Sequence, residues 1–167
     1  MVKTIFEGTH VIVIRHDSGW EFVERKKGKS AVSIMARTAD GKLVLIAQYR
    51  APVDARVIDF AAGLVGDEQS DEDAETSARR ELEEETGYRC ANLQKMAFSP
   101  TSPGITSETV TFFLATGLAR AGDGEPEITV YEIAQEKAVE WLRARESEGM
   151  LIDIKVWVGL YFLSQST

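Results

Sequence analysis

Residues 66–88, which read GDEQSDEDAETSARRELEEETGY, constrain the fold of this chain more than any other segment. Ala74, Ala78 and Leu82 recur at four-residue spacing, and this spacing predicts an amphipathic helix with one apolar stripe. The capping residues expected for the helix are Ser70 or Asp71 at its start and Gly87 at its end. The second half of the segment is therefore expected to be helical.

Three glutamates lie on the opposite face of this predicted helix. Glu81, Glu84 and Glu85 occupy positions i, i+3 and i+4, so their carboxylates crowd one patch of surface. Like charges at this spacing destabilise an isolated helix by about 0.2–0.5 kcal/mol per pair, and the helix dipole disfavours anions near the C-terminal end. A cation that offsets the repulsion is expected, because clustered carboxylate oxygens are what Mg²⁺ or Mn²⁺ prefers. The alternative is a solvated acidic face.

The residues around these glutamates fill the pattern Gly-x5-Glu-x7-Arg-Glu-U-x-Glu-Glu-x-Gly-U, in which U is a bulky apolar residue. The matching residues are Gly66, Glu72, Arg80, Glu81, Leu82, Glu84, Glu85, Gly87 and Tyr88. The segment resembles the Nudix box, the signature of hydrolases that cleave a nucleoside diphosphate linked to another group. In many relatives an Ala-Gly pair opens the box. Here that pair is Ala62-Gly63, and its use would place a three-residue insertion before Glu72.

The resemblance implies a divalent-metal centre that contains Mg²⁺ or Mn²⁺. Pyrophosphate hydrolysis needs charge neutralisation on the phosphate oxygens and a water activated at neutral pH, and such an ion supplies both. The implied metal ligands are Glu81 and Glu85, with Glu84 close by, and the backbone carbonyl of Ala62. Arg80 and Glu72 resemble the pair that holds the box glutamates in position. Arg80, through this support, and Glu84, through its place beside the implied ligands, are therefore expected to contribute to catalysis.

A second resemblance covers the segment before the box, YRAPVDARVIDFAAGLVG. In the ADP-ribose pyrophosphatase and nucleoside-diphosphate-sugar branch of the family, this region reads Gln-Tyr-Arg-x-Pro and then Glu-x-Pro-Ala-Gly. The first element is present here, whereas Asp59 and Ala61 replace the Glu and the Pro of the second. Arg50 ends a predicted strand and is expected to bind phosphate through its guanidinium. The alternative for Arg50 is an ordinary surface arginine.

Residues 99–108, SPTSPGITSE, form a predicted turn-rich loop that resembles the Ser-Pro-Gly loop of the same branch. The resemblance places Gly104 in the substrate-binding loop and Glu108 near the terminal sugar, and the alternative for Glu108 is a charge at a strand edge. Aromatic stacking of the base leaves no motif. Trp20, Phe22 and Tyr49 are candidates for such stacking by position only.

The acidic loop ARAGDGEPE, residues 119–127, is the predicted source of the general base. In the resembling pyrophosphatases a glutamate from this loop accepts the proton. Glu125 and Glu127 are the candidates, and Gly122 and Gly124 are expected to give the loop mobility. Glu125 is preferred, because strand pairing beside Ile128 should restrict Glu127. The alternative is a pair of solvated loop charges.

Further strands are expected near residues 10–16, 20–25, 31–37, 42–49, 56–60, 91–98, 109–116 and 128–133. Helical character is expected at 134–147, and the tail LIDIKVWVGLYFLSQ is expected to be one apolar helix of about four turns. The strand order and the resemblance together predict an α/β fold, a Nudix α/β/α sandwich around a mixed β-sheet. Residues 1–167 are expected to form one domain, with an N-terminal antiparallel hairpin over about 1–28.

The composition limits the partners of this domain. A net charge of −8 argues against binding to a nucleic-acid backbone, although a small anionic substrate is still possible if metal ions neutralise it. Cys90 is the only cysteine, which excludes an intrachain disulfide. No apolar run approaches membrane-spanning length, so a cytoplasmic enzyme without a membrane partner is expected. The resemblance and the strand WEFVER, in which Trp20 and Phe22 share one face, predict a homodimer through the N-terminal hairpins. The alternative is that this pair faces the protein's own core.

These observations predict a Nudix hydrolase that cleaves the pyrophosphate bond of ADP-ribose or of a nucleotide sugar such as GDP-mannose. The expected products are a nucleoside monophosphate and a sugar phosphate. One alternative substrate class comprises dinucleoside polyphosphates or nucleoside triphosphates, which leave the 49–63 segment and the Ser-Pro-Gly loop unexplained. A non-catalytic nucleotide-binding module is a further alternative, although such proteins typically lose the box glutamates, and all of them are present here.

Overall fold

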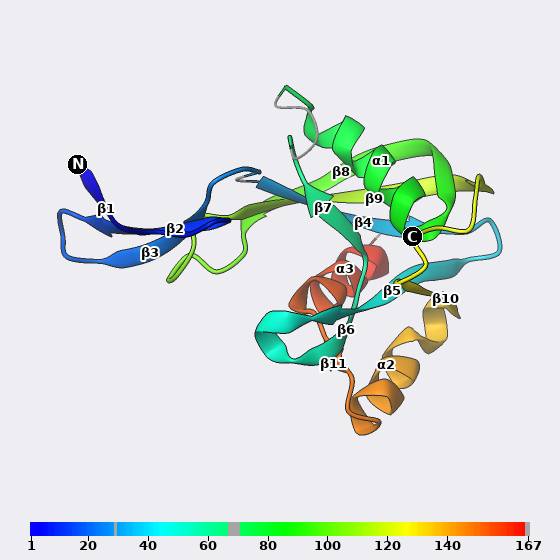
Figure 1. The fold of residues 1–167 in the computed structure, drawn as a ribbon. Coiled ribbons are helices and arrows are strands. Elements are labelled where there is room, and N and C mark those ends of the chain that lie inside the picture. Colours follow the sequence, from blue (N-terminus) through cyan, green and yellow to red (C-terminus); the bar gives the residue numbers. More distant parts are fainter. Residues whose placement is uncertain (29, 67–70, 166–167) are drawn as a thin grey trace.

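The computed structural model describes residues 1–28, 30–66 and 71–165. It shows a large mixed sheet with helices on both faces and a smaller N-terminal sheet that projects to one side (Figure 1). Within the described residues, no helix is long and apolar enough to cross a membrane.

The N-terminal sheet contains β1 (Val2–Glu7), β2 (Val11–His16) and β3 (Glu21–Arg25). The strands of the large sheet are β4 (Ser30–Arg37), β5 (Lys42–Arg50), β6 (Ala55–Asp59), β7 (Ala61–Leu64), β8 (Tyr88–Pro100), β9 (Thr109–Arg120), β10 (Thr129–Ala134) and β11 (Leu151–Ile152). The helices are α1 (Ala74–Thr86), α2 (Ala138–Ser147) and α3 (Ile154–Ser164), with short 3-10 turns η1 (Ala51–Val53) and η2 (Gln135–Lys137).

The large sheet has the strand order β11-β6-β5-β4-β9-β8, and β7 and β10 pair additionally with β4 and β5. The pairs β4–β9 and β6–β11 are parallel, whereas the other pairs are antiparallel. In the middle of the sheet, residues 32–36 and 43–47 are buried without interruption. Such continuous burial is typical of a strand that is covered on both faces, and it explains the unbroken apolar runs in the sequence.

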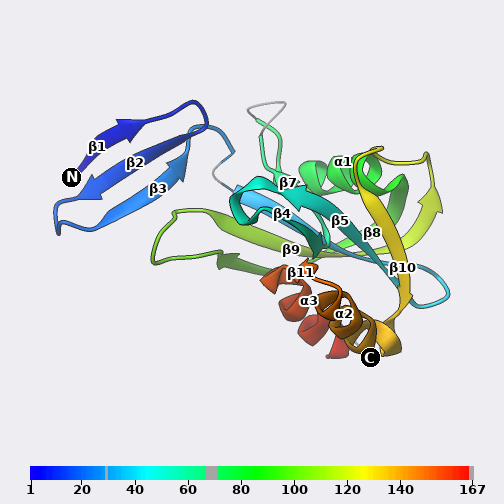
Figure 2. The ribbon, with the colours of Figure 1, turned by 60° about the horizontal axis from the view of Figure 1, so that its bottom comes forward.

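Each face of the large sheet has its own hydrophobic core. Ala78 and Leu82 of α1 pack on one face, together with buried side chains such as Ile34. Leu142 of α2 and Leu163 of α3 pack on the other face. Figure 2 shows α1 on one side of the sheet and α2 with α3 on the opposite side. The predicted α/β/α sandwich around a mixed sheet is therefore confirmed.

The N-terminal sheet has three antiparallel strands rather than the two of the expected hairpin, because β1 pairs with β2. It contacts the rest of the molecule through β3, where Val23 N–H donates to Ile105 O at 2.8 Å and Ser107 N–H donates to Val23 O at 3.2 Å. Every residue of β1 is exposed. This sheet therefore extends outward with little core of its own (Figures 1 and 2).

Most predicted strands are confirmed with small shifts, but the interpretation of the tail was wrong over its first residues. Leu151 and Ile152 form a strand parallel to β6, and the helix that follows has 11 residues. Asp153 separates the two elements, since its side chain caps α3 by accepting the Lys155 N–H at 2.9 Å. The strands β1, β7 and β11 were not predicted. Strands β8 and β9 are longer than expected, and η2 precedes the helix expected at 134–147.

A buried ion pair connects α3 to the strand before the box. Asp59 is 1% exposed, and its Oδ1 accepts the Phe60 N–H at 2.8 Å. Lys155 Nζ lies 2.9 Å from Asp59 Oδ2 and 2.7 Å from Asp153 Oδ2. Burial raises the pKa of Asp59 to about 6, against the opposing effect of Lys155. A Cβ on Gly159 would lie 2.4 Å from the Phe60 ring, so α3 packs closely on the same segment.

Candidate active site

Helix α1 carries the predicted carboxylates and is capped at both ends. Asp73 is the N-cap, because its side chain accepts the Thr76 N–H at 2.7 Å. The expectation of Asp71 was wrong, and the alternative, Ser70, lies outside the described residues. Gly87 ends the helix as predicted, with a φ of 71° that favours glycine.

Arg80 holds three acidic side chains together. Its guanidinium contacts Glu84 Oε2 at 2.7 Å, Glu81 Oε1 at 2.9 Å and Glu72 Oε1 at 3.2 Å. Hydrogen bonding to Arg80 is the main reason that the pKa of Glu72 is below its ordinary value. Gly66 also contributes, because its backbone bonds to the Glu72 carboxylate. Gly66 and Glu72, the opening positions of the matched pattern, are therefore directly connected.

Gly63 allows α1 to approach the sheet closely. A Cβ at this position would lie 1.9 Å from Glu81 Oε1, a separation that real structures do not show. The Ala62-Gly63 pair therefore lies against the carboxylates of Glu81 and Glu85. Burial raises the pKa of the Glu81 carboxyl, and the nearby charges of Glu84 and Glu125 also raise it, against the effect of Arg80.

Glu85 is the most buried of the box glutamates, with 7% of its surface exposed. Its Oε2 accepts the Ala62 N–H at 2.8 Å, and its Oε1 accepts a longer bond of 3.5 Å from Gln48 Nε2. Burial raises the pKa of Glu85 to about 8, the Ala62 N–H opposes this shift, and the negative charge of Glu81 adds to it. A cation beside Glu85 would favour its charged form.

The donor set fits a small hard cation. Carboxylate oxygens of Glu81, Glu84 and Glu85 come from one helix face, and the Ala62-Gly63 backbone lies against them. Oxygen donors of this kind suit Mg²⁺ or Mn²⁺. Among residues 1–28, 30–66 and 71–165, no three acidic, histidine or cysteine side chains already converge as a metal site. Instead Arg80 holds Glu81 and Glu84, and the Ala62 N–H holds Glu85, so the ligand assignment stays a prediction.

A cleft of about 720 Å³ adjoins this carboxylate cluster and crosses the sheet. Ala62 and Gly63 line its middle, beside Arg50 at the end of β5. Arg50 is exposed, and its charge acts on Glu85 to lower the pKa of that carboxyl. Arg50 therefore lines the cleft close enough to act on Glu85, and its contact with phosphate stays a prediction. Lys155 also lines the cleft.

At the β9 side of the cleft, Glu108 forms an ion pair with Arg25 of β3. Thr101 also lines this side, and its hydroxyl lies 3.4 Å from Glu108 Oε1. Trp20 and Gly104 are brought together, because the Trp20 indole N–H donates to Gly104 O at 3.2 Å. Neither Trp20 nor Gly104 is among the described residues that line the cleft, so their contact with substrate stays a prediction.

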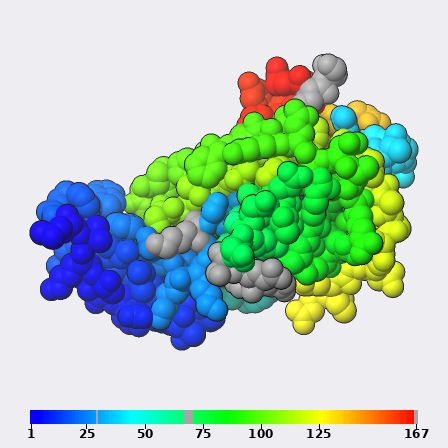
Figure 3. Space-filling model, turned by 90° about the horizontal axis from the view of Figure 1, so that it is seen from above, coloured from blue at the N-terminus to red at the C-terminus, as the bar shows by residue number. Residues whose placement is uncertain are grey.

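The loop between β9 and β10 lies beside the C-terminal end of α1, and in Figure 3 its yellow surface adjoins the green helix. Glu125 is exposed and acts electrostatically on Glu81. Glu127 is also exposed, in a turn closed by the Ile128 N–H to Glu125 O bond of 3.1 Å. The expectation that strand pairing restricts Glu127 was wrong, since β10 begins at Thr129.

The two loop glycines lie against the end of α1. Gly124 has a φ of 75°, and a Cβ there would lie 2.9 Å from Glu85 O. Gly122 N–H donates to Gly87 O at 3.2 Å. Both residues bring the loop close to the helix, and their contribution to loop mobility stays a prediction.

The sequence did not identify Arg25, Asp153 or Lys155 as residues of the cleft, although all three line it. Arg25 pairs with a carboxylate 83 positions away, which no local pattern reveals. Asp153 and Lys155 stand two residues apart in an otherwise apolar tail. Two charges in such a segment were the sequence signal that could have pointed to a polar site there.

The sequence profile of the NUDIX domain matches residues 27–157. The chain is 35% identical over 125 residues to the ADP-ribose pyrophosphatase of Bacillus subtilis (strain 168), which covers 72% of this chain and 66% of that protein. It is 34% identical over 147 residues to the GDP-mannose pyrophosphatase of Enterobacter sp. (strain 638), and the match covers 80% of this chain and 72% of that protein. It is also 31% identical over 138 residues to the methanol dehydrogenase activator of Bacillus methanolicus, and this match covers 80% of this chain and 71% of that protein.

Among solved structures, that of an ADP compounds hydrolase is similar in fold, with a TM-score of 0.63 at 21% identity. This match covers 84% of the present chain and 80% of that chain. The chain belongs to the Nudix family, so the recognition based on residues 66–88 is confirmed. The relatives named as pyrophosphatases confirm the predicted class of enzyme. The profile match begins after β3, so the N-terminal sheet lies outside it.

Replacement of Gly63 by Ala is expected to weaken metal binding without unfolding the protein. The new Cβ would overlap the carboxylate of Glu81, which can turn away because it ends a flexible side chain. We expect Mn²⁺ affinity, measured by isothermal titration calorimetry, to fall roughly tenfold or more, the usual effect of disturbing the surroundings of a metal ligand.

Gly104→Ala is the matched control, because a Cβ at Gly104 meets nothing within 4 Å. Thermal unfolding of both variants should match that of the wild type. Unchanged Mn²⁺ affinity in Gly63→Ala would show that Glu81 is not a ligand.

Proposed function

We propose that this chain is a Mg²⁺- or Mn²⁺-dependent hydrolase that cleaves the pyrophosphate bond of a nucleoside diphosphate linked to a sugar. ADP-ribose and GDP-mannose represent the substrate class, and the products are a nucleoside monophosphate and a sugar phosphate. The observation that carries this proposal is the complete set of box carboxylates on α1, held by Arg80 and the Ala62 N–H, next to a cleft that Ala62, Gly63 and Arg50 line. Relatives named as ADP-ribose and GDP-mannose pyrophosphatases support the same class.

The residues of the site divide the work of hydrolysis. When bound, the divalent ion supplies charge neutralisation and a water activated at neutral pH. Arg50 binds a phosphate oxygen and positions the pyrophosphate beside Ala62-Gly63. Arg80 keeps the carboxylates of Glu81 and Glu84 on one side of the helix, so that they do not have to be ordered during the reaction.

The extent of the cleft favours a substrate with groups on both sides of the pyrophosphate. Arg50 and the Ala62-Gly63 backbone lie between the β9 side, with Glu108, and the β11 side, with Lys155. A nucleoside triphosphate has only one organic group and would leave one side of the cleft unfilled. The carboxylate of Glu108 suits the hydroxyl groups of a sugar, because it accepts their hydrogen bonds.

A substrate panel tests this proposal. We expect ADP-ribose or GDP-mannose to give a kcat/KM at least about tenfold above that of any nucleoside triphosphate, since tenfold corresponds to about 1.4 kcal/mol of transition-state binding from the second half of the cleft. Mg²⁺-dependent hydrolysis should be measured as release of the monophosphate. Faster hydrolysis of triphosphates than of every nucleotide sugar would contradict the proposed substrate class.

We further propose Glu125 as the general base, because its carboxylate is exposed and lies within electrostatic range of Glu81. Glu127 occupies the tip of the adjacent turn and serves as the matched control. Glu125→Gln is expected to lower kcat roughly 100-fold or more with little change in KM, whereas Glu127→Gln should behave like the wild type. Loss of kcat in Glu127→Gln alone would assign the base to Glu127.

The protein is also proposed to form a homodimer through its N-terminal sheet. Phe6 of β1 is 59% exposed, and a second copy that packed on this strand would bury its apolar side chain. Light scattering at micromolar concentration should give about twice the chain mass of 18.5 kDa. Phe6→Glu should shift the population towards monomer, whereas Phe98→Glu, at a similarly exposed position on β8, should not. A wild-type monomer would rule out this dimer.

A further inference from the structure

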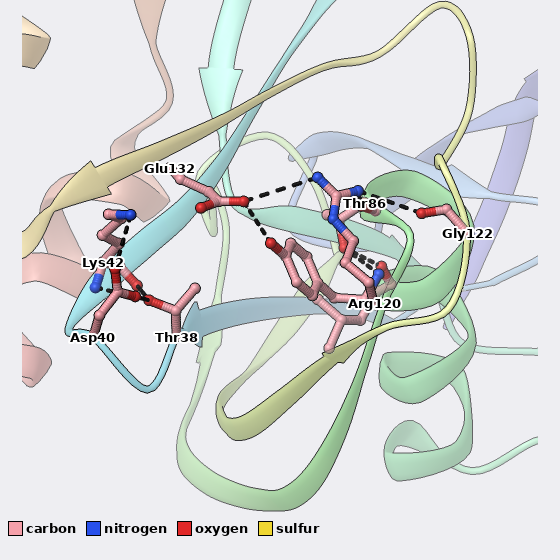
Figure 4. A network of polar contacts seen from close by, with 9 residues as sticks. Thr38, Asp40, Lys42, Thr86, Arg120, Gly122 and Glu132 are labelled. Atoms are coloured by element: carbon pink, nitrogen blue, oxygen red, sulfur yellow. Dashed lines mark hydrogen bonds and ion pairs between the residues drawn. The ribbon is translucent and has the colours of Figure 1, made fainter.

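Arg120 ends β9 at the start of the loop that carries Glu125. Its Nη1 donates to two carbonyls at 3.3 Å, that of Thr86 in the last turn of α1 and that of Gly122 in the loop. Figure 4 shows the guanidinium between these two backbone segments. One side chain therefore connects the loop directly to the helix that carries the box glutamates.

Two further side chains hold the guanidinium in place. It lies over the ring of Tyr88, 4.5 Å from the ring centroid, and Arg120 Nη2 is 3.8 Å from Glu132 Oε1. The Tyr88 hydroxyl donates to the same Glu132 oxygen at 2.5 Å. Because Glu132 belongs to β10, the strand after the loop, this cluster connects both ends of the loop (Figure 4).

The backbone of the loop also contacts the end of α1. Ala121 N–H donates to Gly87 O at 2.8 Å, and Gly122 N–H donates to it at 3.2 Å. A Cβ on Gly124 would contact Glu85 O at 2.9 Å. Residues 121–124 are thus packed on the last turn of α1, and Glu125 is the first residue beyond this contact.

We propose that Arg120 is a positioning residue for hydrolysis, which fixes the start of the loop to α1 so that Glu125 stands at a set distance from the box carboxylates. The inference rests on the proposed function, in which Glu125 is the general base. The guanidinium is suited to this role because Nη1 donates to both carbonyls while Nη2 lies near Glu132 and the flat group stacks on Tyr88, a combination that a lysine ammonium does not reproduce. Loss of the contact leaves the start of the loop attached to α1 through the backbone bonds of Ala121 and Gly122 to Gly87.

The test compares kcat and KM of Arg120→Met and Arg120→Lys with those of the wild type on ADP-ribose. We expect kcat of Arg120→Met to fall roughly 10- to 100-fold with KM nearly unchanged, as displacement of a reacting group by about 1 Å can do. Arg120→Lys should recover only part of the loss. Arg143→Met is the matched control, because Arg143 also stacks on an aromatic ring, Trp157, and pairs with Glu146 on the surface.

A double-mutant cycle separates positioning from general support of the fold. If Arg120 acts through Glu125, Arg120→Met should cost little further activity in a Glu125→Gln background, because the base is already absent. Amide hydrogen exchange of the metal-free protein gives an independent measurement. Exchange at Ala121 and Gly122 should accelerate in Arg120→Met, while exchange in the buried strand β4 should not change.

Several results would overturn the role of Arg120. In the kinetic test, these are an unchanged kcat in Arg120→Met or no effect of Glu125→Gln itself. In the double-mutant cycle, the contrary result is an equal loss of kcat from Arg120→Met with and without Glu125. In the exchange experiment, it is an unchanged amide exchange rate at residues 121–122. Failure of the proposed function is distinguishable, because it would appear first as a wild-type enzyme that hydrolyses no nucleotide sugar in the panel.

Discussion

The contact of one guanidinium with three carboxylates is the interaction on which the rest of the site depends. Arg80 lies within 3.2 Å of Glu72, Glu81 and Glu84, so a helix face that would otherwise repel itself becomes a stable surface. The repulsion comes from the spacing of Glu81 and Glu84 on one helix face, and the guanidinium offsets it locally. The same contact links the residues before α1 to its polar face, and it directs Glu81 towards the strand that contains Gly63.

The close approach of backbone to this helix is the second constraint. At Gly63, the strand β7 comes so near to Glu81 that no side chain fits between them. At Gly124, the loop after β9 makes a similar approach to the carbonyl of Glu85. Two segments that are distant in sequence therefore approach α1 closely, one at the Glu81 side chain and the other at the backbone of the last turn. Positive charge from Arg50 lies on the cleft side, so an acidic protein can bind an anionic substrate without a basic surface elsewhere.

Much of this arrangement could be predicted from the sequence because the signals are local. The spacing of Ala74, Ala78 and Leu82 indicated α1, and the carboxylate pattern indicated its chemistry. The rest depends on pairing between distant residues. A strand of two residues such as β11 has no periodicity of its own, and its apolar residues fit a helix equally well. The N-cap was misplaced because several consecutive polar residues could serve, and only the contact of Asp73 with Thr76 distinguishes among them.

The buried pair of Asp59 and Lys155 gives the C-terminal helix a role beyond covering the sheet. Asp59 immediately precedes the Phe60–Gly63 segment that meets the box helix, and its countercharge comes from the first turn of α3. Truncation of the chain before Lys155 would leave a carboxylate that is 1% exposed without its cation, and breaking a buried pair in this way typically costs about 3–5 kcal/mol. Cleavage between β11 and α3 by a protease would therefore affect the centre of the molecule as well as its surface.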